Sequence, residues 1–190
     1  MKKISIIIIV LFSVLSIGCK KTHCPAFPAD LNYFPYTKGQ VLKFINSQQE
    51  THSFIINGAG NSGSWSFEWN CKCECDVSST FEMLSNPDSV GENYFPSILG
   101  FINIYGEEGD PISEIGMNFV FSSYIYNSEG LSKTLEIVKP VPLTEVSKYI
   151  DDIIAIENEN NKIITKIVIV KGKGLVSYTT ADGEEWKLVE

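Results

Sequence analysis

Residues 70–76 read Asn-Cys-Lys-Cys-Glu-Cys-Asp and place three cysteines, Cys71, Cys73 and Cys75, on alternate positions. Three thiols could bind a soft metal such as Cu(I), exchange disulfides, or line the buried side of a strand. The spacing differs from that of structural zinc sites, and no histidine pair accompanies it. We therefore predict no metal centre and no cofactor, and we keep a thiol-based Cu(I) or redox site as an alternative.

An N-terminal targeting segment precedes a further cysteine. Lys2 and Lys3 form a positive start, and residues 4–17 are almost continuously apolar. This run of about fourteen residues is shorter than the roughly twenty that a membrane-spanning helix needs. The segment therefore has the form of a secretory signal.

The end of this segment resembles the lipobox of bacterial lipoproteins. Small Gly18 directly precedes Cys19, although Ser16 stands where leucine is usual. The resemblance implies a lipoprotein signal peptide over residues 1–18 and a diacylated, palmitate-type anchor on Cys19. Lys20, rather than aspartate, follows the cysteine, which favours the outer membrane over the inner membrane.

The charge balance excludes one class of partner. The chain carries a net charge of −8, which becomes about −10 once the two lysines of the signal are removed, and it contains no arginine. Arginine supplies the planar fork that binds phosphates and guanine edges. We therefore expect no nucleic-acid partner.

No residue set predicts catalysis. A nucleophile–base–acid arrangement needs a histidine or an equivalent base within reach. The two histidines are His23, close to the anchor, and His52, at the start of an expected strand, and we expect both to be plain surface residues. Gly172 and Gly174 fit a tight turn between strands better than a phosphate loop. The sequence predicts a protein that is not an enzyme.

The rest of the chain reads as strands separated by turn residues. Runs rich in Val, Ile, Phe and Tyr predict strands at residues 41–46, 52–57, 98–106, 117–126, 134–139, 164–172 and 174–178. Asp182-Gly183 is the pair preferred in a type I′ hairpin turn. Residues 143–154 fit either a short helix or a turn followed by a strand. The predicted fold is mostly β: a curved antiparallel sheet, half-barrel or barrel-like, of about nine or ten strands with at most one short helix.

The longest alternating pattern explains the cysteines. From Trp65 to Met83 the odd positions are apolar, cysteine or small, and the even positions are mostly polar or charged. Successive side chains of a strand point to opposite faces, so all three cysteines fall on the core side. Nineteen residues make an unusually long strand, so we expect a bend, a bulge, or two strands joined by a loop that preserves the alternation.

The domain layout and the disulfide follow from these patterns. We expect a lipidated N-terminus and tether over residues 19–30 and a single β-rich domain over residues 31–190. On a regular strand Cys71 and Cys75 lie about 13 Å apart, too far to bridge. We therefore predict one disulfide from Cys24 to the cluster formed by Cys71, Cys73 and Cys75.

Four segments together resemble small, largely uncharacterised lipoproteins of Bacteroidota-type bacteria. They read CPAFP, YFPYTKGQVLKFIN, CKCEC and ITKIVIVKGKGLVSYTTADGEEWKL. The resemblance implies a β-rich outer-membrane or surface lipoprotein, facing the periplasm or the exterior, and brings no catalytic residues. It also implies a candidate O-glycosylation site at Ser89, within the triplet Asp-Ser-Val of a predicted loop.

The sequence thus predicts a lipid-anchored, non-catalytic envelope protein with a binding or structural role. Its membrane contact is the N-terminal lipid, and its partner is a glycan, a protein or a hydrophobic ligand. The first alternative is a half-barrel carrier that holds a lipid or another hydrophobic molecule. The Cu(I) or redox protein is the second. An open pocket lined by Phe and Ile would favour the carrier, whereas a core filled by side chains would favour the binding module.

Overall fold

The structure is a computed structural model that describes residues 26–67, 73–85, 97–107, 112–122, 128–141 and 143–189. Two short 3₁₀ helices occur in these ranges, η1 (Ala29–Leu31) and η3 (Leu143–Tyr149). The strands are β1 (Val41–Ile45), β2 (Thr51–Phe67), β3 (Cys73–Ser85), β4 (Ser97–Glu107), β5 (Ile112–Ser122), β6 (Ser128–Val141), β7 (Ile153–Glu157), β8 (Ile164–Val170), β9 (Gly174–Thr180) and β10 (Glu185–Leu188).

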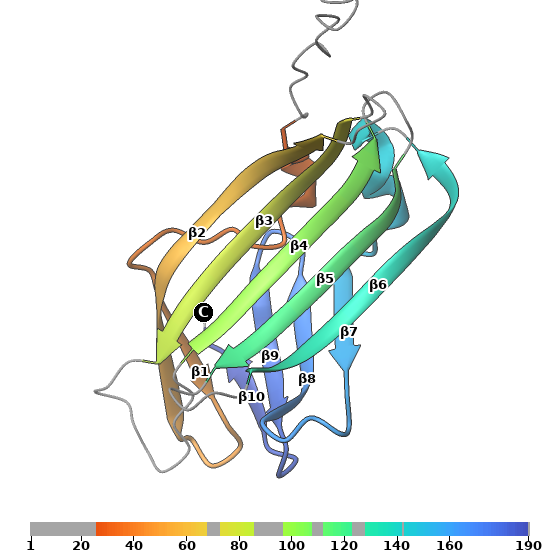
Figure 1. Ribbon diagram of the computed structural model, residues 1–190. Coiled ribbons are helices and arrows are strands. Elements are labelled where there is room, and N and C mark those ends of the chain that lie inside the picture. The colour runs from red at the N-terminus through yellow and green to blue at the C-terminus, as the bar shows by residue number, and fades with distance from the viewer. Residues whose placement is uncertain are drawn as a thin grey trace, which may run out of the picture.

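All ten strands form one antiparallel sheet that curls on itself. The strand order is β6-β5-β4-β3-β2-β1-β10-β9-β8-β7, so consecutive strands pair throughout except across one seam between β6 and β7. The long strands β2 to β6 form one wall, and the shorter strands β7 to β9 lie behind it (Figure 1). The predicted mostly β, barrel-like antiparallel fold is therefore confirmed.

The side chains that alternate inward along the strands fill the space between the two walls. Inward positions are mostly apolar on both walls, and the N-terminal segment adds four buried side chains between them. The most completely buried members of this core include Leu31, Tyr33, Phe44, Phe54, Ile56, Phe81, Met83, Ile98, Phe119, Phe121, Tyr178 and Trp186.

The long alternating segment of residues 65–83 is two strands. β2 ends at Phe67 and β3 begins at Cys73, with Phe67 opposite Cys73 and Trp65 opposite Cys75 in the ladder. Directly opposite residues share a face in an antiparallel pair, so the connection preserves the alternation. An irregularity between Ile56 and Gly58 shifts the inward row of β2 from even to odd positions.

Two local predictions are resolved in the C-terminal part. Residues 143–154 combine both alternatives, because η3 covers Leu143–Tyr149 and the strand β7 starts at Ile153. Asp182-Gly183 does lie in the β9–β10 hairpin, but the predicted type I′ turn is wrong. That turn requires positive φ at both central residues, whereas only Gly183 has it, at 89°, and the Gly183 N–H donates to the Thr180 carbonyl at 2.9 Å.

Candidate functional site

The residues singled out for chemistry are mostly not in the described part of the chain. The predicted anchor Cys19, the disulfide candidates Cys24 and Cys71, and the glycan candidate Ser89 lie outside it. Cys73 and Cys75 are backbone positions of β3, two residues apart, and their side chains also lie outside the described set. The thiol cluster, the lipid and the disulfide therefore remain predictions.

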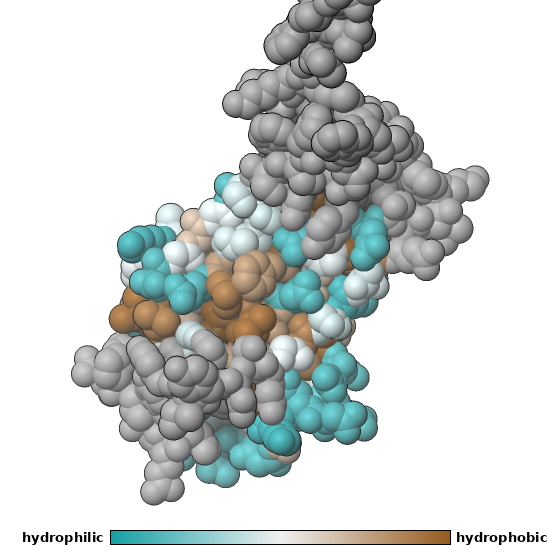
Figure 2. Space-filling model, in the orientation of Figure 1, coloured by the Kyte–Doolittle hydropathy of each residue, from teal (hydrophilic) through white to brown (hydrophobic). Residues whose placement is uncertain are grey.

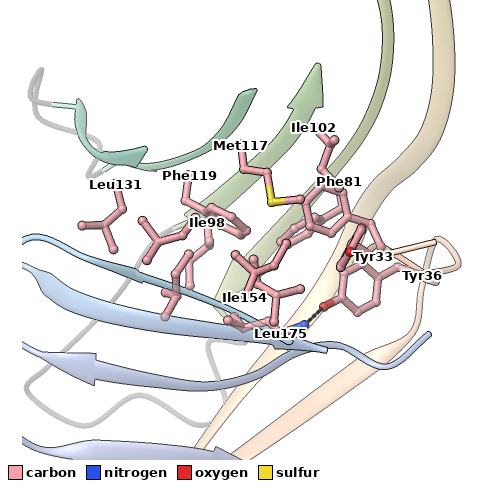
Figure 3. Close-up of a cluster of buried hydrophobic side chains, with 14 of the residues drawn as sticks. Tyr33, Tyr36, Phe81, Ile98, Ile102, Met117, Phe119, Leu131, Ile154 and Leu175 are labelled. Atoms are coloured by element: carbon pink, nitrogen blue, oxygen red, sulfur yellow. Dashed lines mark hydrogen bonds between the residues drawn. The ribbon is translucent and has the colours of Figure 1, made fainter. Parts of the chain in front are cut away.

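The described interior is organised around the N-terminal segment, residues 29–36, which passes between the two walls of the barrel. The Phe34 ring packs edge-on against Phe81 of β3 and Phe119 of β5, with centroids 4.7 and 5.8 Å away. The Tyr36 ring also contacts Phe81, at 4.8 Å. Phe34 is only 6% exposed. The segment thus fills part of the space between the two walls, with Tyr33 and Tyr36 beside Phe81 (Figure 3).

Two tyrosine hydroxyls and one carbonyl tie this segment to the short-stranded wall. The Leu175 N–H donates to the Tyr36 hydroxyl at 2.6 Å, and the Tyr33 hydroxyl donates to the Asp151 carbonyl at 2.6 Å. The Gly172 N–H donates to the Asn32 carbonyl, also at 2.6 Å. Burial raises the pKa of both tyrosines, so both remain neutral hydrogen-bonding groups.

Two glycines make room for the rings. Gly100 lies between Phe81 and Phe119 in one cross-strand row, and a Cβ there would collide with the Phe81 ring. Gly174 has a φ of +86°, which side chains rarely adopt, and a Cβ there would collide with Tyr36. The sequence predicted only a tight turn between β8 and β9. In the structure, Tyr36 also packs against this turn.

His52 belongs to a second aromatic cluster, formed with Phe44, Phe54, Tyr178 and Trp186. Its ring stacks on Trp186 with centroids 3.6 Å apart and planes 5° apart, and its Nδ1 lies 2.8 Å from the Tyr178 hydroxyl. Burial lowers the pKa of His52, partly opposed by the carboxylate of Glu50. The expectation of a plain surface histidine is therefore wrong, because β2 turns this position inward, opposite Phe44 in the ladder.

A buried amide closes the same end of the barrel. The Asn46 side chain is 4% exposed, and its Nδ2 donates to the carboxylates of Glu50 and Glu184, both at 2.7 Å. Its Oδ1 accepts from the backbone N–H groups of Gln48 and Glu50. One side chain thereby fixes the β1–β2 turn and joins it to the turn before β10.

The outer face of β1, β2 and β3 carries an apolar row. Val41, Ile55 and Leu84 are directly opposite one another across β1, β2 and β3, alternating with buried neighbours. Val41 is 48% exposed and Ile55 36%. Apolar side chains gather on this face in the space-filling view (Figure 2). Contiguous exposed apolar surface of this kind is typical of interaction sites.

The described part of the chain contains no group of three or more His, Cys, Asp or Glu residues that could hold a metal ion. No helix within the same ranges is long and apolar enough to cross a membrane. No protein-family model matches the chain, and neither does any curated protein or any solved structure.

The segments YFPYTKGQVLKFIN and ITKIVIVKGKGLVSYTTADGEEWKL were among those that carry the family resemblance, but the sequence did not connect them. The structure brings them together, because Asn32 and Tyr36 contact the turn at Gly172 and Leu175. Two features of the sequence could have indicated this contact: the cluster of aromatic residues near the N-terminus, and the glycines far along the chain that leave room for an aromatic ring. Neither pattern alone specifies its partner across some 140 residues.

Proposed function

We propose that this chain is a lipid-anchored, non-catalytic protein of the bacterial outer membrane that acts as a binding module through its outer surface. The lipobox supports the anchor at Cys19. The filled interior supports the binding module over the carrier, since Phe34 and Tyr36 take up the space between the walls. That packing is the observation on which the choice depends.

The outer apolar row favours a protein as the partner. Val41, Ile55 and Leu84 are aliphatic, and charges of both signs, Lys43 and Glu82, lie on the same outer face. An aliphatic centre with a charged rim is the usual anatomy of a protein–protein contact. The mixed rim charges and the negative net charge of the chain disfavour an anionic lipid surface.

Attachment is tested by replacing Cys19 with alanine. The variant should remain unprocessed by the lipoprotein peptidase and lose its acyl label, whereas wild type partitions with the outer membrane. Alkylation of denatured protein before reduction tests the disulfide from Cys24 in the same samples. Normal acyl labelling of the variant would refute the anchor.

The binding surface is tested separately by a photo-crosslinking residue in intact cells. At position 55 it should give a discrete protein adduct, and at Ser132, exposed on the outer face of β6, it should give none. Native mass spectrometry of the protein from its own host adds a second readout. Retained lipid or copper, with no adduct at position 55, would replace the proposal by the carrier or the thiol alternative.

A further inference from the structure

We propose that the N-terminal segment Ala29–Tyr36 is an exchangeable occupant of the barrel, whose withdrawal opens a site for a single-chain amphiphile such as a long-chain fatty acid. This inference goes beyond the proposed function, because it concerns a second, open state of the interior that Phe34 and Tyr36 fill in the closed form. It depends neither on the lipid anchor nor on the apolar row of the outer face.

Side-chain contacts, rather than backbone pairing with the sheet, hold the segment inside the barrel, as they would hold a ligand. Regular pairing with the sheet begins only at Gly39, whose N–H donates to Ile56, and at Gln40, which accepts from Ile56. Before that point, among the described residues, one backbone bond joins the segment to the barrel, from Gly172 to Asn32. Aromatic rings and tyrosine hydroxyls make the other contacts, so the segment can leave without breaking the ladder of the sheet.

The walls that it would expose are suited to a hydrocarbon chain. Phe81 and Phe119 contact the segment from the long strands, and Leu175 contacts it from β9. Ile98 and Ile154 belong to the same buried cluster (Figure 3). These side chains are at most 2% exposed in the closed form. A hydrocarbon chain would replace the apolar contacts of Phe34 and Tyr36 with contacts of the same kind.

The head group follows from the backbone N–H group that Tyr36 satisfies. When Tyr36 leaves, the buried Leu175 N–H loses its acceptor, whereas the carbonyl that Tyr33 leaves belongs to the exposed Asp151 and can accept from water. A buried polar group without a partner is costly, so the incoming molecule must bring an oxygen acceptor for Leu175. A carboxyl group supplies one, whereas a plain alkane does not. The site should therefore select a fatty acid over a hydrocarbon of equal length.

The test compares two full-length variants that each remove one buried phenyl ring. Phe34→Ala loosens the segment, and Phe44→Ala removes a ring from strand β1, in the second aromatic cluster. With a fluorescent eighteen-carbon polyene fatty acid as probe, Phe34→Ala should bind at least tenfold more tightly than wild type. Phe44→Ala should bind no better than wild type. Equal binding by the two variants would show an ordinary cavity and would overturn the proposal.

A milder variant decides the matter if Phe34→Ala does not fold. Tyr36→Phe keeps the ring and loses only the acceptor of Leu175. It should bind the fatty acid about threefold more tightly, exchange the Leu175 amide proton faster, and show no gain for the matching alkane. Unchanged fatty-acid affinity would mean that the segment is a permanent part of the core.

Discussion

The two walls of the barrel are stabilised in different ways. The long wall, β2 to β6, has strands of 11 to 17 residues, so each pair is joined by many ladder bonds. The short wall, β1 and β7 to β10, has strands of four to seven residues. In its turns, backbone N–H groups donate hydrogen bonds to the side-chain oxygens of Asn46, Asn161 and Asp182.

Ladder length and turn chemistry are two different ways to fix the register of a strand, and the turns that join the long strands lie outside the described residues. A long ladder with one buried face specifies its own register, because a shift by one residue would expose every inward side chain. A strand of four or five residues has too few such positions, so polar turns must fix its register. The N-terminal segment then packs against both walls and couples them, which predicts where substitutions should be costly.

The largest loss in the free energy of unfolding should come from removing a buried apolar side chain of the long wall. Phe119→Ala removes a fully buried ring that contacts Phe34 and Phe81, and it should lower the free energy of unfolding by about 3–5 kcal/mol. Asn118→Ala, the next residue on the outer face, should change it by less than about 0.5 kcal/mol. Denaturant titration measures both, and similar losses would contradict the assignment of faces.

A smaller effect is expected where the short wall meets the N-terminal segment. Gly174→Ala combines an unfavourable positive φ with a collision against Tyr36 and should cost about 2–4 kcal/mol. Gly172→Ala, with a φ of +75° and open space around it, should cost only about 1–2 kcal/mol. If thermal unfolding shows equal losses, Tyr36 does not rest on this turn.

Substitutions in the polar turns should lower the free energy of unfolding by less than the two substitutions above. Asn46→Ala removes the acceptor of two backbone N–H groups and the link between the carboxylates of Glu50 and Glu184, at a cost of about 1–3 kcal/mol. Asn158→Ala, in the exposed β7–β8 turn, removes one such acceptor and should cost less. The reverse order would mean that the turns do not fix the register of the short wall.

The smallest expected effect is the contribution of His52 to the pH dependence of stability. Burial holds the pKa of His52 in the folded chain below its ordinary 6.5, so the unfolded chain binds the proton more readily. The stability that neutral His52 contributes is therefore complete above about pH 6.5 and is lost as the pH falls through the folded-state pKa. His52→Gln should reduce this pH dependence of the melting temperature. An NMR titration midpoint above 6.5 would reverse the sign.

The fold class was predictable because it depends on local pattern. Alternating apolar positions and regularly spaced turn residues specified an antiparallel β protein, and the inward row at Val77, Ser79, Phe81 and Met83 was buried as expected. The side of His52 was not predictable, since its isolated position at the start of a strand indicates no face. The turn at Asp182-Gly183 was misread because the same pair fits turns of different geometry.

For the candidate site, too, one part was predictable from the sequence and another part was not. The sequence by itself determined the charge, the lipobox resemblance and the strand alternation, because these are properties of composition and of neighbours along the chain. Only the tertiary structure decided that residues 29–36 lie inside the barrel, against Phe81, Phe119 and the turn at Gly174. Such contacts join residues 47 to 138 positions apart. They depend on how the whole sheet curls, which no local pattern encodes.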